Sequence, residues 1–89
     1  MYGVEVAASA EKELRALRPF DRKPVLAAIE RQLTTEPGVE GRNRKQLVNL
    51  VPPFEATPPV WELRVGEFRV FYDVDEAQKK VFIRRMVVS

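Results

Sequence analysis

The hydrophobic pattern at the start of the chain changes from the period of a strand to the period of a helix. Apolar and polar side chains alternate over residues 2–7, which is typical of a short strand. Ala10, Leu14 and Leu17 then recur at helical spacing, and Ser9 is the expected helix cap. We therefore predict a strand followed directly by a helix.

A second helix is predicted after a short connection. Asp21 is its expected cap, and Pro24 falls in its expected first turn, where proline is tolerated. Val25, Ile29 and Leu33 form an apolar stripe along it. Two helices joined by few residues should form an antiparallel hairpin, and the apolar side of such a hairpin needs a sheet to cover.

The second half of the chain has the alternating pattern of strands separated by turns. Residues 45–50 are a candidate strand, and the proline-rich residues 51–59 are expected to form a loop. Residues 60–65 and 68–74 alternate around a two-residue turn, and residues 79–88 form the last candidate strand. The predicted fold class is α+β, with an N-terminal strand and a two-helix antiparallel hairpin packed on a three- to four-stranded, mainly antiparallel sheet.

Length and composition narrow the possible functions. With 89 residues the chain has room for one modest core, so residues 1–89 are expected to form a single domain. The absence of Cys and His excludes disulfides, thiolate metal sites and the commonest metal ligand, so we expect no metal and no small-molecule cofactor. The sequence has neither an apolar run of membrane-spanning length nor a signal-peptide pattern, so we expect a cytoplasmic protein without a membrane partner.

Positive charge is concentrated in the second half of the chain. Residues 1–41 carry 6 basic and 7 acidic side chains, whereas residues 42–89 carry 9 basic and 6 acidic ones. The basic residues of the second half form short clusters: Arg42, Arg44 and Lys45; Arg64 and Arg69; Lys79, Lys80, Arg84 and Arg85. This distribution says more about a nucleic-acid partner than the formal net charge of +2 does.

The two best-defined strands carry a specific motif. From Trp61 to Asp75 the chain reads aromatic, acidic, Leu, Arg, Val, Gly, any residue, Phe, Arg, Val, any residue, Tyr, and then an acidic turn. This string closely resembles the central hairpin of toxins of the RelE/ParE superfamily, and residues 44–47 also stand where that family has a corresponding element. The resemblance covers nearly the whole chain. It implies a compact α+β toxin that a cognate antitoxin protein neutralises and, in RelE-like members, cleavage of messenger RNA on the ribosome.

Metal-free RNA cleavage uses the neighbouring ribose 2′-hydroxyl as the nucleophile. It needs a base for that hydroxyl, cations for the phosphorane charge and an acid for the leaving 5′-oxygen. The resemblance places the phosphate-binding arginine of the family at Arg69 and a basic catalytic position near Arg64, with Lys45 as a candidate base or phosphate clamp. The further candidates for binding RNA phosphates are Arg42, Arg44, Arg84 and Arg85. If the apolar residues of both strands share the core, Arg64 and Arg69 emerge on one surface.

The same charged residues also allow a purely structural interpretation. Arg64 is able to pair with Glu62 or Glu67, and Arg69 is able to pair with Asp73, as ordinary solvated residues of a sheet. Two aromatic residues of the motif are expected in the core rather than in a site: Trp61 and Tyr72.

The last residues depart from the family pattern. RelE-like nucleases usually follow the last strand with a further basic residue, and often a tyrosine, whereas this chain has Val88 and Ser89 near the basic position and no later tyrosine. Arg84 or Arg85 is a candidate substitute, because alternation points one of the two away from the core.

Three functions therefore stay open. The first is an RNA-cleaving toxin, the second is a ParE-like inhibitor of DNA gyrase, and the third is a binding domain of the same fold without catalysis. The cluster at residues 42–45 is compatible with a solvated loop, a phosphate contact or an antitoxin contact. All three functions predict a cognate antitoxin bound with a dissociation constant on the order of nanomolar or tighter. Its expected seat is the apolar surface of residues 51–59 or an unpaired edge at the last strand.

Overall fold

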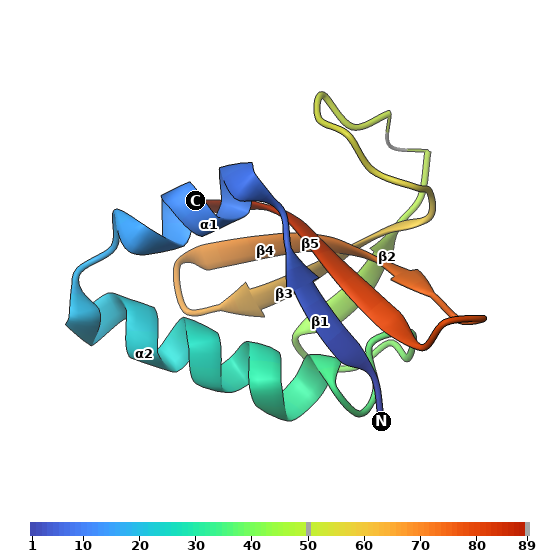
Figure 1. The fold of residues 1–89 in the computed structure, drawn as a ribbon, viewed down its shortest axis with the longest axis horizontal. Helices are drawn as coiled ribbons and strands as arrows, with labels where there is room; N and C mark the ends of the chain where they lie inside the picture. The colour runs from blue at the N-terminus through green and yellow to red at the C-terminus, as the bar shows by residue number, and fades with distance from the viewer. Residues whose placement is uncertain (50, 89) are drawn as a thin grey trace.

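The computed structural model describes residues 1–49 and 51–88. The elements in chain order are β1 (Gly3–Val6), α1 (Ala8–Arg15), α2 (Pro19–Ala28), η1 (Ile29–Leu33), β2 (Arg44–Leu47), β3 (Val60–Val65), β4 (Phe68–Asp75) and β5 (Lys80–Val88). The predicted order of strand, two helices and successive strands is confirmed. Figure 1 shows α1 and α2 connected at one end, and the contacts place α1 against β5 and α2 against β3.

The sheet has five strands in the order β1-β5-β4-β3-β2. The strand β1 pairs in parallel with β5, and the other neighbours are antiparallel. The α+β fold class is confirmed, but the sheet has five strands rather than three to four because both β1 and the short β2 join it. Alternation identifies strands but does not say which of them pair, since pairing depends on contacts between distant parts of the chain.

The predicted unpaired edge at the last strand is wrong. The strand β5 lies between β1 and β4, and the edges of the sheet are β1 and β2. Beyond the end of β1, other parts of the chain form hydrogen bonds with backbone groups of β5. The Ala7 N–H donates to the Ile83 carbonyl at 2.8 Å, and the Glu13 carboxylate of α1 accepts the Met86 N–H at 2.8 Å. These contacts leave fewer open backbone groups for a partner strand.

Both helices begin without the side-chain caps that the sequence predicts. Ser9 lies inside α1, and neither helix has a side-chain hydrogen bond at its cap. Pro19 occupies the first position of α2, where its missing N–H has no intrahelical partner to lose and its fixed φ suits a helix. Asp21 therefore lies in the first turn rather than at the cap, and Pro24 lies in the helix interior.

The helices cover one face of the sheet, which we call the covered face, and complete the core. The buried core residues are Ala10, Leu14, Val25, Ala28, Ile29 and Leu33 from the helices and Trp61, Leu63, Phe68, Val70, Tyr72, Val81, Ile83 and Met86 from the strands. The rings of Trp61 and Tyr72 stack with their centroids 6.3 Å apart, which confirms their predicted place in the core. The Tyr72 hydroxyl donates to the Pro37 carbonyl at 2.7 Å and so ties the loop after η1 to the sheet.

The opposite side of the sheet, which we call the open face, carries the polar half of each strand. The proline-rich residues 51–59 form the predicted loop and fold over one end of this face. The Thr57 N–H donates to the Asp73 carboxylate at 2.9 Å, and the rings of Phe54 and Phe71 lie 5.8 Å apart. The other end of the open face, at Arg64, stays exposed.

Candidate functional site

Two arginines lie directly opposite each other at the exposed end of the open face. Arg64 of β3 and Arg69 of β4 form one register pair of the hairpin. The turn between the two strands includes Gly66, whose φ of 59° belongs to the left-handed region that favours glycine. The prediction that both arginines emerge on one surface is confirmed. Like charges placed directly opposite each other are unfavourable in a sheet, so the pair is suited to an anion.

A buried carboxylate neutralises one of the two arginines. The Glu62 Oε1 atom accepts a hydrogen bond from Arg69 Nε at 3.0 Å. The same oxygen forms an ion pair with Arg69 Nη2 at 2.9 Å. The Glu62 side chain is 4% exposed, whereas that of Arg69 is 35% exposed. The alternative pair of Arg69 with Asp73 is not formed, because Asp73 is held by another arginine. Arg69 also stacks over the Phe71 ring, with its guanidinium carbon 5.4 Å from the ring centroid.

Lys45 and Arg42 join Arg64 around a small depression, which we call the hollow. Lys45 lies opposite Glu62 in the register of β2 and β3. The hollow has a volume of about 240 Å³ and is lined by Gly41, Arg42, Asn43, Arg44, Lys45, Glu62 and Arg64. Within residues 1–49 and 51–88, the side chains of Arg42, Lys45 and Arg64 make no hydrogen bond or ion pair. These cations are available to a ligand.

Arg44 is separated from the other candidates by its place in the strand. It lies opposite Leu63, so alternation directs it to the covered face. Its guanidinium donates to the Gln32 side-chain oxygen and, at 3.0 Å, to the Val39 carbonyl. Arg44 thereby ties the loop before β2 to η1, and the contacts that the structure gives it are structural.

A β-bulge in β5 directs both Arg84 and Arg85 out of the core. Arg85 pairs with Phe71 in the register and Ile83 pairs with Tyr72, so that Arg84 is the extra residue. The prediction that only one of the two arginines points away from the core is wrong, because the extra residue interrupts the two-residue period. Both side chains are held by carboxylates: Arg84 contacts Asp73 at 2.7 Å, and Arg85 contacts Glu13 at 2.6 Å.

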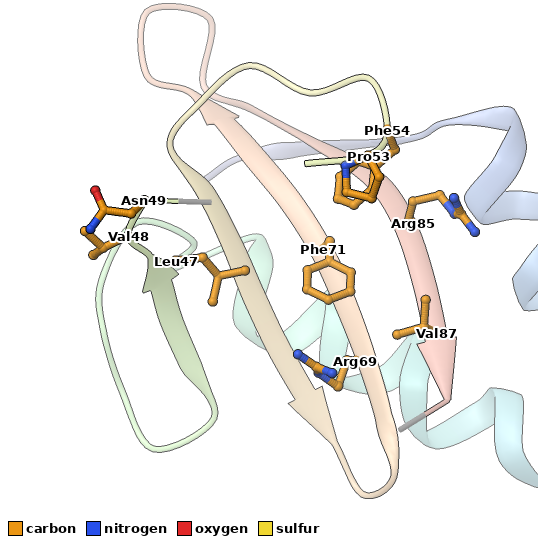
Figure 2. Close-up of a pocket in the computed structure, with 9 residues that line it drawn as sticks. All are labelled: Leu47, Val48, Asn49, Pro53, Phe54, Arg69, Phe71, Arg85 and Val87. Atoms are coloured by element: carbon orange, nitrogen blue, oxygen red, sulfur yellow. The ribbon is translucent and has the colours of Figure 1, made fainter. Parts of the chain in front are cut away.

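A second depression, which we call the groove, lies between the loop and the middle of the open face. Its volume is about 470 Å³, and it is lined by Leu47, Val48, Asn49, Pro53, Phe54, Arg69, Phe71, Arg85 and Val87. Figure 2 shows Phe71 between Leu47 and Val87, with Arg69 near one end of the groove and Phe54 near the other. Since Arg69 lines the groove and its partner Glu62 lines the hollow, the two depressions meet at this ion pair.

The remaining chemistry of the open face is limited. Burial raises the pKa of Tyr72 far above its ordinary value, and the nearby Arg44 charge only partly opposes this. Tyr72 therefore keeps its proton and stays a core residue. In the part of the chain that the structure describes, no three Cys, His, Asp or Glu side chains gather in a way that suits a metal ion. None of the helices described is long and apolar enough to cross a membrane.

Sequence reasoning missed two of the carboxylates that shape this face. Glu62 is one of two alternative partners that the sequence offers for Arg64, but it pairs with Arg69 through a diagonal contact between the antiparallel strands. Glu13 is separated from Arg85 by 72 positions, and no local pattern connects them. The groove likewise depends on how the loop folds back, which local periodicity does not specify.

Comparison with known proteins places the chain in a family. Residues 4–86 match the family described as the ParE toxin of the type II toxin–antitoxin system parDE. The chain belongs to this toxin family. The resemblance of its central hairpin to RelE/ParE-superfamily toxins is thereby confirmed, and the protein is the toxin of a type II toxin–antitoxin system. None of the curated proteins compared with the sequence matches it.

Solved structures of RelE proteins share the fold. The chain is similar to isolated Escherichia coli RelE, with a TM-score of 0.78 and 18% identity over 100% of this chain and 85% of that one. It is similar to RelE in the archaeal RelE–RelB complex of Pyrococcus horikoshii, with a TM-score of 0.74 and 23% identity over 98% and 93%. For the RelBE2 toxin–antitoxin complex of Mycobacterium tuberculosis the values are 0.69 and 19%, over 99% and 98%.

Proposed function

We propose that this toxin cleaves messenger RNA on the ribosome, in the cytoplasm and without a metal ion, at the exposed end of its open face. The observation that carries the proposal is that Arg64 and Arg69 lie opposite each other, close to Lys45, whose side chain has no hydrogen bond or ion pair within the described residues. Opposed guanidinium groups bind the oxygens of one phosphate and offset the extra charge of a phosphorane. The hollow beside them supplies both a carboxylate and an amine for proton transfer.

The seven basic candidates do not contribute equally to this proposal. Arg64 and Arg69 take the scissile phosphate, Lys45 takes part in proton transfer or clamps the phosphate, and Arg42 contacts a neighbouring phosphate at the rim of the hollow. Arg84 and Arg85 would have to break their ion pairs with carboxylates before they could bind RNA. Arg44 holds the loop before β2 in place.

A ParE-like inhibitor of DNA gyrase is the second candidate function. Three arginines of the open face are already neutralised by carboxylates, and the groove between them is largely apolar. A concave surface of this kind suits contact with a protein, and such a contact needs no catalytic group. The match to the ParE toxin family agrees with this alternative.

A cognate antitoxin is the proposed partner under either function. RelE proteins similar in fold to this chain were solved as complexes with RelB-type antitoxins. Val48, which lines the groove, is 75% exposed, and Val51 of the proline-rich loop is 90% exposed. We expect the product of the adjacent reading frame to bind with a dissociation constant on the order of nanomolar. Isothermal titration calorimetry that detects no binding would contradict this.

Induced expression in bacteria, followed by mapping of messenger RNA ends, tests the proposed function. We expect the wild type to arrest growth and to produce new cuts in translated messages, and both effects should be lost in Arg64→Ala and Arg69→Ala. Arg31→Ala is the matched control because Arg31 is an exposed arginine of η1, away from the open face. Arrest without cuts, together with loss of gyrase supercoiling activity, would favour the ParE-like function. Normal growth would overturn both.

A further inference from the structure

The carboxylate of Glu62 is held in an unusual position for a residue of this sheet. Its side chain is 4% exposed and yet it lines the hollow, between Lys45 on one neighbouring strand and Phe71 on the other. Arg64 follows it on the same face of β3. Among the described residues that line the hollow, Glu62 is the only acidic one. A single carboxylate is thus fixed at the centre of the cations that the proposed function assigns to RNA.

The two oxygens of this carboxylate have different surroundings. Oε1 makes both contacts with Arg69, the hydrogen bond from Nε and the ion pair with Nη2. Oε2 has no hydrogen-bond partner within residues 1–49 and 51–88. It is not among the fully buried side-chain atoms of this part of the chain that lack a partner, so it is not fully buried. Oε2 therefore keeps some solvent-accessible surface, and Glu62 lines the hollow. An oriented carboxylate with one free oxygen is the geometry that a general base requires.

The other buried carboxylate of the open face shows what a structural ion pair looks like in this protein. Asp73 is 2% exposed and holds Arg84 with both of its oxygens, while Oδ2 also accepts the Thr57 N–H. No oxygen of Asp73 is left for a ligand in the part of the chain described. Glu62 and Asp73 are both buried and both pair with an arginine. Only Glu62 has a carboxylate oxygen without a hydrogen-bond partner among the described residues.

We propose that Glu62 is the proton acceptor of the cleavage reaction, an inference that rests on the proposed function. Glu62 Oε2 removes the proton of the ribose 2′-hydroxyl while the 2′-oxygen forms its bond to phosphorus. The bond from phosphorus to the 5′-oxygen breaks, and the leaving 5′-oxygen takes a proton from the Lys45 ammonium. The products are a 2′,3′-cyclic phosphate and a 5′-hydroxyl. Exchange with water returns one proton from Glu62 and supplies one to Lys45, so the enzyme is restored.

Lys45 suits the acid role better than the base role. Lys45 is exposed and lies opposite Glu62, the residue to which the base role is assigned. Arg69 serves two purposes in this arrangement, since a guanidinium has five N–H donors and only Nε and Nη2 are used by Glu62. Its remaining N–H groups are available to the phosphate.

Single-turnover cleavage of a message on programmed ribosomes, measured across a pH series, tests this inference. The variant is Glu62→Gln, which keeps the shape of the side chain and an oxygen acceptor for Arg69. We expect its rate to fall about 10²- to 10⁴-fold and the rise of the wild-type rate with pH to disappear. Asp73→Asn is the matched control: it alters a buried carboxylate that pairs with an arginine, and we expect it to keep the rise with pH. Thermal unfolding of each variant verifies that it is folded.

The possible failures are distinguishable. If the wild type and Glu62→Gln cleave at similar rates with the same pH profile, Glu62 is not the proton acceptor, while the proposed function survives. If Asp73→Asn loses the rise with pH to the same extent as Glu62→Gln, a general structural effect explains both and the inference is overturned. If the wild type cleaves no message on the ribosome at any pH, the proposed function is overturned and the inference with it. Products with a 2′,3′-cyclic phosphate that the wild type and Asp73→Asn form, and that Glu62→Gln forms about 10²- to 10⁴-fold more slowly, support the inference.

Discussion

The two faces of the sheet differ more from each other than the strands do. On the covered face, Leu63, Val70 and Ile83 have no exposed surface and belong to the hydrophobic core. On the open face, the neighbouring positions Arg64 and Arg69 carry charge and line open depressions. Successive side chains of a strand point to opposite faces of the sheet. One strand therefore contributes to the core with one set of side chains and to the candidate site with the other. Substitutions on the two faces should therefore separate folding from function.

The open face is itself divided into two parts. At the end that the loop covers, Asp73 and Arg84 form a pair in which both carboxylate oxygens accept hydrogen bonds from the protein. At the other end, the pair of Glu62 and Arg69 borders the hollow and the groove. Similar ion pairs therefore stabilise the fold in one place and are available to a ligand in the other.

Adjacent residues of β3 should give the largest contrast. We expect Leu63→Ala to lower the free energy of unfolding by about 2–5 kcal/mol, because it leaves a cavity in the core. Arg64→Ala should change the free energy of unfolding by no more than about 0.5 kcal/mol, because the Arg64 side chain is exposed. Urea denaturation of both variants measures this difference. Equal losses in the two variants would mean that the faces are not energetically independent.

Removal of the buried Asp73 carboxylate should cause the next largest loss in the free energy of unfolding. Asp73→Ala leaves the Arg84 guanidinium, whose side chain is 18% exposed, and the Thr57 N–H without their acceptor. We expect a loss of about 2–3 kcal/mol in the free energy of unfolding. A loss below about 1 kcal/mol in urea denaturation would show that solvent reaches Arg84 freely despite the covering loop.

Tyr72→Phe tests the polar contact within the covered face. The substitution leaves the buried Pro37 carbonyl without its donor, so we expect a loss of about 1–2 kcal/mol at neutral pH. Circular dichroism during urea denaturation measures it. No loss would show that the Pro37 carbonyl finds water or another donor in the variant.

The same residue should make stability depend on alkaline pH. Burial raises the folded-state pKa of Tyr72, so above the ordinary tyrosine pKa of about 10 the unfolded chain releases this proton while the folded protein retains it. The contribution of Tyr72 is complete below pH 10 and is then lost at up to about 1.4 kcal/mol per pH unit. Subtraction of the Tyr72→Phe stability profile from the wild-type profile isolates this contribution. A flat difference between pH 9 and pH 11 would contradict the raised pKa.

The smallest effect is expected at a pair outside both faces. Glu11 and Arg15 lie four positions apart on α1 and contact at 2.6 Å, but their side chains are 52% and 77% exposed. Glu11→Gln should therefore change the free energy of unfolding by no more than about 0.5 kcal/mol, and this change should vanish at high salt. A larger change in the free energy of unfolding that persists at high salt would mean that Glu11 stabilises the fold by something other than this exposed ion pair.

Local patterns in the sequence determined the elements and the faces of the sheet. The alternation in residues 60–65 and 68–74 is that of two strands, and the glycine turn between them places Arg64 and Arg69 opposite each other. The apolar stripes of the helices predicted a hairpin over a sheet, and Trp61 and Tyr72 were assigned to the core. These features follow from the sequence because each depends on periods of two or 3.6 residues within one element.

The tertiary structure alone decided the partners of the charged residues. The bulge at Arg84 shifts the period of β5, and Glu13 reaches Arg85 from a helix 72 positions away. The parallel pairing of β1 with β5 places the last strand inside the sheet. Such contacts depend on strand register and on how distant segments close against each other, and periodicity within one segment carries no information about either. The free oxygen of Glu62 belongs to this second class, since it depends on where Arg69, Lys45 and the loop before β2 come to rest.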